Sequence, residues 1–454
     1  MSTGMQELSY PEALRLVRAH APLMPQERVD LSRAVGRVLH APLLAFRDEP
    51  PGDKSAMDGF ALRATDTLGA SPEKPLAFRY QAVVGAGHLY GGDAPKALPP
   101  GAAVRLMTGA LLPPGADCVV KLEDVEETDP PGTEGGRFLL RAPLAPYTHV
   151  FPAGSTQRAG ETLLAPGTVL DAHMLALIAS QGEPRPLVRR QPVVGVLALG
   201  DELAPPGTSL EPGQIYMSNP YQLEALLAEE GCQPRLLGIR GDDPHAIADC
   251  LRAGMAGDAG APPADVLLTL GGSHRGDFDF VERVLNSLGA QLHFRQTRLN
   301  VAGSTLFASM VHGERRVLFL GLPGTPSAAW CGFEAFVRPA LRAMQGRVPA
   351  GLPSLWATLA SAPRIRPGRA HLIPLRLDWG SADAPPAAAL PLAAPLGRGD
   401  RTHGARGGAP HPDLPTPMLA DALLWLEEDA PPPAEGERVR VSLLPGRPRA
   451  GTEI

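Results

Sequence analysis

The sequence is short of cysteine and lysine, and it has no long apolar run. Its four cysteines, Cys118, Cys232, Cys250 and Cys331, lie far apart and form no CxxC pair. This spacing does not fit a zinc site, and it suits the reducing cytoplasm, where we expect the protein to reside. None of the twelve histidines belongs to an HExxH motif, which also excludes a helical zinc-hydrolase site.

Membrane and nucleic-acid partners are not expected. No uninterrupted apolar stretch reaches the roughly 18 residues that a membrane-spanning helix needs. Residues 1–16 lack the basic start and the apolar run of a signal peptide. The net charge is −6, whereas a protein that binds phosphate backbones needs a concentrated basic face.

Glycine and proline, by contrast, are abundant. The 454 residues include 50 glycines and 51 prolines, and no Gly-X-Y period runs through them. This excess predicts many turns and loops. The hydrophobic share of 44% is that of an ordinary globular protein. At roughly 150 residues per domain, the length suggests about three domains.

The hydrophobic pattern changes several times along the chain. Helical spacing after Ser9 predicts a helix over residues 8–20, and a second helix is expected over 32–39. Helical spacing returns over residues 161–185. Between these helical parts, up to about residue 146, short segments bounded by glycine and proline predict a β-rich domain. Such an insertion would make the helical unit discontinuous.

Residues 190–345 alternate between apolar strands and amphipathic helices. This alternation predicts a mainly parallel sheet with helices on both faces. Strand-like segments return from residue 353 on. Between them lies a stretch rich in alanine, proline, glycine and arginine, residues 380–416, which we expect to be a flexible loop.

The loops at the ends of the predicted parallel strands hold the candidate site, because ligands bind outside the carboxyl ends of such strands. Three loops bring carboxylates and two bring glycine-rich backbone; the four loops are residues 200–202, 241–244, 271–279 and 321–326. Glycines let the main chain approach a phosphate, and a helix that starts at Thr325 and Pro326 favours an anion. Carboxylates beside a phosphate suggest Mg²⁺.

Each of these loops has a plainer interpretation when it is taken singly. An acidic loop such as 241–243 is usually a helix cap, and the GLPGTP sequence of residues 321–326 is usually a turn. Four such loops at one predicted edge favour a common site. The residues alone therefore predict a phosphate-containing ligand that is handled with a divalent metal.

Several motifs together resemble the molybdopterin molybdenumtransferases, the family that includes the gephyrin E domain. Residues 55–60 (SAMDGF) match its SAMDGY/F signature, and residues 107–117 (MTGALLPPGAD) match its MTGA…GAD segment. Residues 200–203 (GDEL) and 213–219 (GQIYMSN) match its TGDEL and GQIYxxN elements. The remaining glycine-rich and acidic loops follow in the family's order, so that the resemblance runs from about residue 8 to residue 345.

The resemblance implies an α/β multidomain protein of four parts. These would be a discontinuous linker domain (1–47 and 147–188), an inserted β-rich domain (48–146), a three-layer α/β/α molybdopterin-binding domain (189–345) and a C-terminal β domain (346–454). It also implies a homodimer, with the SAMDG and MTGA segments of one subunit facing the α/β site of the other.

The resemblance further implies an activity and its reactants. The family inserts molybdenum from molybdate into adenylated molybdopterin and releases AMP, a step of molybdenum cofactor biosynthesis that we expect to depend on Mg²⁺. Further partners implied are a molybdopterin adenylyltransferase or a recipient molybdoenzyme.

Site residues follow by position in the family's motifs. The catalytic residues implied are Glu202, Asp243 and Asp279, and Glu202 and Asp279 would also hold Mg²⁺. The substrate-binding residues implied are Asp58, Thr108, Asp201, Asn219, Asp242, Gly271, Gly272, Arg275, Gly324 and Thr325. By spacing alone, Asp58 is a turn residue and Thr108 is a buried hydroxyl before a turn. Glu123 aligns with a family glutamate, and a solvated face is the equal alternative for it.

The sequence departs from the family at several polar positions. The family's KPGKP appears as residues 300–304 (NVAGS), and the chain's only lysines, Lys54, Lys74, Lys96 and Lys121, all precede the α/β domain. Its NIRxxGED segment appears as residues 149–156 (HVFPAGST), without the arginine and the carboxylates. Leu199, Met217 and Thr325 replace the threonine of TGDE, the aspartate of DTN and the asparagine of GLPGNP.

The missing lysines affect the binding of anions. A pocket for molybdate and pyrophosphate needs fixed positive charge, which Arg275, Arg295 or Arg298 would have to supply. Two functions therefore stay open: an active molybdenumtransferase with a remodelled anion pocket, or a catalytically impaired paralogue that binds molybdopterin or the finished cofactor for storage or delivery. A dehydrogenase is disfavoured, because no GxGxxG follows the first strand.

Overall fold

The computed structural model describes residues 7–128, 135–258, 260–272, 280–379, 390–396 and 418–446. The chain divides into two compact units, and both are discontinuous in sequence. Unit 1 comprises Met1–Ala41, Pro166–Ala172 and Arg185–Ile454, and unit 2 comprises Pro42–Ala165 and His173–Pro184. The finer division into four domains stays a prediction.

Unit 1 begins with the predicted helix, α1 (Tyr10–His20). Ser9 starts it with a capping box, in which Ser9 and Glu12 each hydrogen-bond the other's backbone N–H. The helix buries Tyr10, Ala13 and Val17. The second helix expected over residues 32–39 is wrong: only a 3₁₀ turn forms there (Leu31–Arg33), because Gly36 turns the chain at φ +75°.

The largest sheet of unit 1 has six strands in the order β16-β13-β17-β20-β19-β18. Their bounds are β13 Val193–Leu199, β16 Gln233–Arg240, β17 Val266–Leu270, β18 Gln291–Phe294, β19 Leu306–His312 and β20 Arg315–Leu322. The first four strands in this order are parallel, as predicted, while β19 pairs antiparallel with β20, and β18 pairs antiparallel with β19. All seven residues of β13 and all five of β17 are buried.

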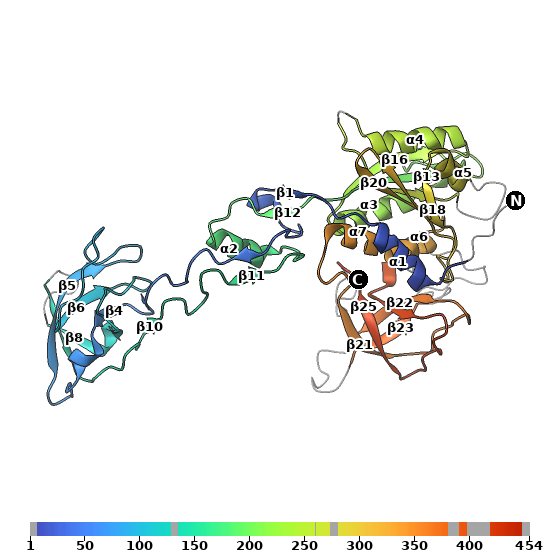
Figure 1. Ribbon diagram of the computed structural model, residues 1–454. Coiled ribbons are helices and arrows are strands. Elements are labelled where there is room, and N and C mark those ends of the chain that lie inside the picture. The colour runs from blue at the N-terminus through green and yellow to red at the C-terminus, as the bar shows by residue number, and fades with distance from the viewer. Residues whose placement is uncertain are drawn as a thin grey trace. The chain divides into compact units, whose positions relative to one another are not determined.

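Helices cover both faces of this sheet, which confirms the predicted three layers (Figure 1). On one face lie α4 (Pro244–Ala256) and α5 (Phe280–Ser287), packed on residues such as Leu197. On the other lie α3 (Asn219–Glu229) and a helical run, packed on residues such as Val196. That run consists of α6 (Pro326–Gly332), the π-helical turn η4 (Phe333–Val337) and α7 (Arg338–Gln345). Successive strand residues face opposite sides, so one apolar run supplies both cores.

The C-terminal part of unit 1 is a closed barrel with its own apolar core. Its strands are β21 Ser354–Leu359, β22 His371–Asp378, β23 Leu392–Pro395, β24 Ala422–Leu426 and β25 Arg438–Leu443. Strand β23 falls within the stretch 380–416, which was expected to be a flexible loop. It pairs with β22 and β21, while residues 380–389 and 397–416 lie outside the described residues.

Unit 2 is rich in strands, and residues 48–146, the segment predicted to be a β-rich insertion, fall within it. Its main sheet has the order β7-β4-β6-β5-β9-β8. The bounds are β4 Gly59–Leu62, β5 Leu76–Val84, β6 Ala102–Leu106, β7 Cys118–Lys121, β8 Val125–Glu127 and β9 Arg137–Leu140. The helical spacing over 161–185 is only partly realised, because β11 (Thr162–Leu164) precedes the helix α2 (Ala172–Ser180).

Four short two-stranded ribbons complete the described strands. In unit 2, β2 (Leu43–Leu44) pairs with β11, and β3 (Lys54–Ser55) pairs with β10 (Val150–Phe151). In unit 1, β1 (Gln26–Arg28) pairs with β12 (Leu187–Arg189), and β14 (Leu203–Ala204) pairs with β15 (Ile215–Tyr216).

Two predictions from composition can be compared with the structure. All four cysteines are buried and free. Among the described residues, no helix is both long enough and apolar enough to cross a bilayer.

Candidate functional site

Four loops of unit 1 meet at the carboxyl ends of β13, β16, β17 and β20. Because these strands are parallel, their carboxyl ends lie at the same edge of the sheet. The N–H of Gly200, after β13, donates to Arg240 O at the end of β16 (3.1 Å). The N–H of Gly271, after β17, donates to Leu322 O at the end of β20 (3.1 Å). The structure therefore brings together the predicted loops 200–202, 241–244 and 321–326 with Gly271 and Gly272, the described part of the loop 271–279.

Two glycines permit this close approach. Gly271 has φ +93°, and a Cβ atom there would lie 2.7 Å from Leu199 O, so a side chain would collide with backbone. The Cβ position of Gly324 lies 3.6 Å from Gly271 Cα. Backbone of the β17 and β20 loops is thus in direct contact, which leaves main chain rather than side chains at this point of the edge.

Three carboxylates, Asp201, Glu202 and Asp242, gather on the β13 and β16 loops. The N–H of Asp242 lies 3.4 Å from Asp201 Oδ1, and burial, reinforced by the charges of Asp201 and Glu202, raises the pKa of Asp242. No described arginine forms an ion pair with these three groups, so a cation would relieve their repulsion. The described residues contain no group of three possible ligands arranged to hold a metal ion, and Asp279, the other predicted ligand, lies outside them together with Arg275.

Three other predicted site residues help to build the loops. Asp243 caps α4, and its Oδ1 accepts the His245 N–H (2.9 Å). The buried Asn219 donates from Nδ2 to Gly324 O (2.7 Å), which fixes the loop after β20. Thr325 is the N-cap of α6, as predicted, but its side chain makes no capping hydrogen bond. The side chains of Asp243 and Asn219 therefore already form hydrogen bonds with the protein backbone.

In unit 2, the SAMDG and MTGA segments are neighbours although fifty residues separate them in the chain. The N–H of Gly109 donates to Ser55 O (2.9 Å). Asp58 Oδ1 accepts both the N–H and the hydroxyl of Thr108, at 2.6 and 2.7 Å. These bonds hold the pKa of Asp58 below its usual value. Both side chains are exposed, so Thr108 is not the buried hydroxyl that its spacing suggested.

The segment that replaces KPGKP lines a polar cavity of about 420 Å³. It belongs to the same sheet edge, because β19 begins opposite the end of β20, with Leu306 paired to Gly321. Val301 within it has φ +66°, a strained conformation for a β-branched residue. The cations of the cavity come from the segment before β22: Arg366 and Arg369.

These two arginines differ in how they are held. Arg369 pairs with Glu7 (Nη1 to Oε1, 2.9 Å) and is half-buried. Arg366 is exposed, and within the described part of the chain its guanidinium has no hydrogen-bond or ion-pair partner. In this cavity an ion pair holds Arg369, while the guanidinium of Arg366 has no partner among the described residues. Such a cavity suits an oxyanion, because guanidinium groups bind oxyanions through paired N–H donors.

Two of the arginines predicted to replace the lysines have other partners. Arg295 pairs with Glu282 (3.1 Å) and Arg298 with Glu428 (2.6 Å), so both side chains already have ion-pair partners. Arg366 and Arg369 were missed, since they follow the segment 300–304 by more than sixty residues. The available signal was the run RIRPGR at residues 364–369, which places three arginines around a Pro-Gly turn sequence.

Comparisons with known proteins agree with this architecture. Residues 8–182 match the family model described as MoeA N-terminal region (domain I and II), and residues 195–343 match the model of a probable molybdopterin binding domain. A molybdopterin molybdenumtransferase of a Nostoc species is 35% identical over 321 residues, which cover 70% of each chain. That of Bacillus subtilis is 35% identical over 332 residues, or 73% of each chain.

Solved structures give the same result. The molybdopterin biosynthesis moeA protein from Pyrococcus horikoshii superposes with a TM-score of 0.77 at 27% identity, covering 96% of this chain and 99% of that one. The overall fold is therefore shared, including the C-terminal barrel. On the strength of these matches, the chain belongs to the molybdopterin molybdenumtransferase family.

Proposed function

We propose that this chain inserts molybdenum from molybdate into adenylated molybdopterin and releases AMP, with Mg²⁺ bound beside the phosphates. Its family and the acidic and glycine-rich loops at the sheet edge support this proposal. Cleaving a phosphoanhydride requires a cation on the phosphate oxygens and carboxylates that hold the cation. The four free cysteines agree with a reaction in the cytoplasm.

The predicted site residues would then have different chemical roles. Glu202 and Asp279 would hold Mg²⁺, which supplies Lewis-acid stabilisation of the phosphate charge. Asp201 and Asp242 add to the negative potential that attracts the ion. The backbone of Gly271, Gly272 and Gly324, with Arg275 and Thr325, would contact the anionic parts of the substrate. Asp243 and Asn219 would act through the loops that they fix.

The arginine-lined cavity is the observation that supports the proposal most directly. It offers positive charge beside residues 300–304, the segment where the family has its lysines and this chain has none. Arg366 and Arg369 would hold molybdate in this cavity while the dithiolene is presented from the neighbouring loops. Fixed donors aimed at an oxyanion bind it without reorganising at the moment of reaction.

Replacing both arginines tests this assignment. We expect Arg366→Ala together with Arg369→Ala to raise the molybdate concentration needed for half-maximal AMP release by about tenfold or more. Binding of adenylated molybdopterin, measured by calorimetry without molybdate, should be unchanged. Arg364→Ala is the matched control, because Arg364 is exposed in the same run and does not line the cavity. An unaltered molybdate dependence in the double variant would refute the assignment.

Storage or delivery of the cofactor is the second candidate function. The loss of both lysines from residues 300–304 favours it, because weaker anion binding would impair catalysis more than it impairs retention of the pterin. A carrier would bind adenylated molybdopterin tightly and release no AMP. Its partners would be the adenylyltransferase that supplies molybdopterin or the molybdoenzyme that receives it.

A further inference from the structure

The polar cavity beside residues 300–304 is lined by a carboxylate as well as by two arginines. Glu7 lies in its wall together with Arg366 and Arg369, and Glu7 Oε1 pairs with Arg369 Nη1 at 2.9 Å. A carboxylate is unexpected in a cavity that binds an oxyanion, because like charges repel at short range. Glu7 either positions Arg369 for the oxyanion or competes with the oxyanion for it, and the contacts of the two side chains favour competition.

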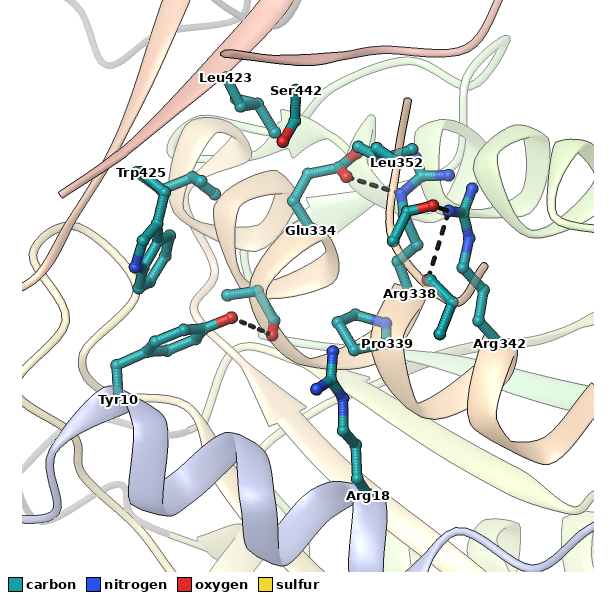
Figure 2. A pocket seen from close by; sticks show the side chains of 14 residues that line it. Tyr10, Arg18, Glu334, Arg338, Pro339, Arg342, Leu352, Leu423, Trp425 and Ser442 are labelled. Atoms are coloured by element: carbon teal, nitrogen blue, oxygen red, sulfur yellow. Dashed lines mark hydrogen bonds and ion pairs between the residues drawn. The ribbon is translucent and has the colours of Figure 1, made fainter. Parts of the chain in front are cut away.

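The backbone that carries Glu7 is fixed against the rest of unit 1. The carbonyl oxygen of the next residue, Leu8, accepts the N–H of Arg298 (2.7 Å). Tyr10, at the start of α1, contacts the ring of Trp425, with ring centroids 3.8 Å apart (Figure 2). These contacts keep the Glu7 carboxylate beside the cavity whether or not its ion pair is formed.

The ion pair itself is open to solvent. The side chains of Glu7 and Arg369 are each 36% exposed. Ion pairs with this exposure contribute little stability, because water and salt screen them. The other hydrogen bond of Arg369, from Nη1 to Thr297 O, is long (3.5 Å). An oxyanion that accepts two charge-assisted hydrogen bonds from the guanidinium can therefore displace Glu7 at little cost.

We propose that Glu7 is a tethered competitor of the oxyanion, whose carboxylate must release Arg369 before both arginines of the cavity can bind the same anion. This role rests on the proposed function, because molybdate is taken as the anion. A competitor attached to the same chain acts at a high effective concentration, so it lowers the affinity of the cavity without closing it. Glu7 thereby sets the molybdate concentration at which the cavity fills.

Calorimetric titration of the full chain with molybdate alone tests the proposal. We expect the Glu7→Gln chain to bind molybdate about three- to tenfold more tightly, because the anion no longer has to displace a carboxylate from Arg369. Glu12→Gln is the matched control. It removes the same charge five residues away, lines no part of the cavity, and leaves a glutamine that can still form the capping box with Ser9. Its affinity should equal that of the unaltered chain.

A second pair of titrations shows whether Glu7 acts through Arg369. In chains that carry Arg369→Ala, the further change Glu7→Gln should improve molybdate binding by less than about twofold. The reason is that the contested guanidinium is gone and the Glu7 side chain can turn to solvent, where salt screens its charge.

The results that would contradict competition differ from those that would contradict the proposed function. Equal binding by the Glu7→Gln chain would overturn the competitor role, and weaker binding would show that Glu7 positions Arg369 instead. An undiminished gain in the Arg369→Ala background would also overturn it. Each of these results leaves the proposed transfer reaction standing, because molybdate still binds. If no chain binds molybdate, the cavity is not the anion site, and the role of Glu7 fails with that assignment.

Discussion

At the sheet edge, Asp201, Glu202 and Asp242 hold negative charge that no ion pair among the described residues offsets. Their neighbours Asp243 and Asn219 already have partners, one in a helix cap and the other on the loop after β20. This contrast separates side chains that build the edge from side chains that remain free to bind. A cation that approaches the edge would thus meet Asp201, Glu202 and Asp242 rather than Asp243 and Asn219.

His293, on β18, allows a test of the packing between α1 and the sheet. Its imidazole contacts the ring of His20 of α1 in a tilted arrangement, with ring centroids 3.9 Å apart, and hydrogen-bonds with Ser309 Oγ (2.8 Å). Burial, with smaller effects of His20 and Arg316, lowers the pKa of His293 from 6.5 to about 4. Between about pH 4 and pH 6.5, His293 is therefore neutral in the folded state, whereas it takes up a proton in the unfolded chain.

The sign of the pH effect follows from this difference. The free energy of unfolding should be fully retained above pH 6.5, fall as the pH decreases to about 4, and level off below that. His293→Gln should reduce this fall when urea unfolding is followed across the window. His312→Gln, at an exposed position on β19, is the control. Equal pH dependence in all three proteins would show that His293 does not titrate as described.

Among the elements, α3 and α7 are joined through one buried glutamate. Glu230, just after α3, pairs with Arg338, with Arg342 (2.9 Å) and with Arg347 (3.2 Å), and its side chain is 1% exposed. Burial raises the pKa of Glu230, but the three arginines outweigh burial and hold it below its usual value. The glutamate therefore stays ionised and fixes the run that follows the loop of residues 321–325.

Removing this carboxylate should be costly. Glu230→Ala leaves three largely buried guanidinium groups without their common partner, and we expect it to lower the free energy of unfolding by about 3–5 kcal/mol. Urea denaturation measures the change. Glu229→Ala, one residue earlier and exposed, should alter stability by less than about 0.5 kcal/mol. A similarly small effect of Glu230→Ala would mean that the cluster adds no net stability.

The secondary-structure elements differ in how well the sequence predicted them. The helix α1 and the strands β13, β16, β17 and β20 followed from capping residues and apolar periodicity, which act locally. The antiparallel pair β18 and β19 did not, and neither did the proximity of Arg366 to residues 300–304. Both depend on contacts between distant segments, and no local periodicity encodes those contacts.

For the whole molecule, the resemblance implies a homodimer whose site combines Asp58 of one subunit with Glu202 of the other. Mixing two inactive variants tests this directly. When Asp58→Ala and Glu202→Ala chains are unfolded and refolded together, half of the dimers are mixed and each mixed dimer has one intact site. AMP release should then return to about a quarter of the unaltered rate. If both residues serve the same subunit's site, mixing restores nothing.

The most direct measurement of the central claim is AMP release by the purified full chain. The chain is supplied with adenylated molybdopterin, molybdate and Mg²⁺, and AMP is quantified against a reaction without protein. We predict AMP well above that background, and its loss in the Glu202→Ala and Asp279→Ala chains. Tight binding of adenylated molybdopterin with no AMP above background would contradict the proposed transfer reaction and identify a carrier of the cofactor instead.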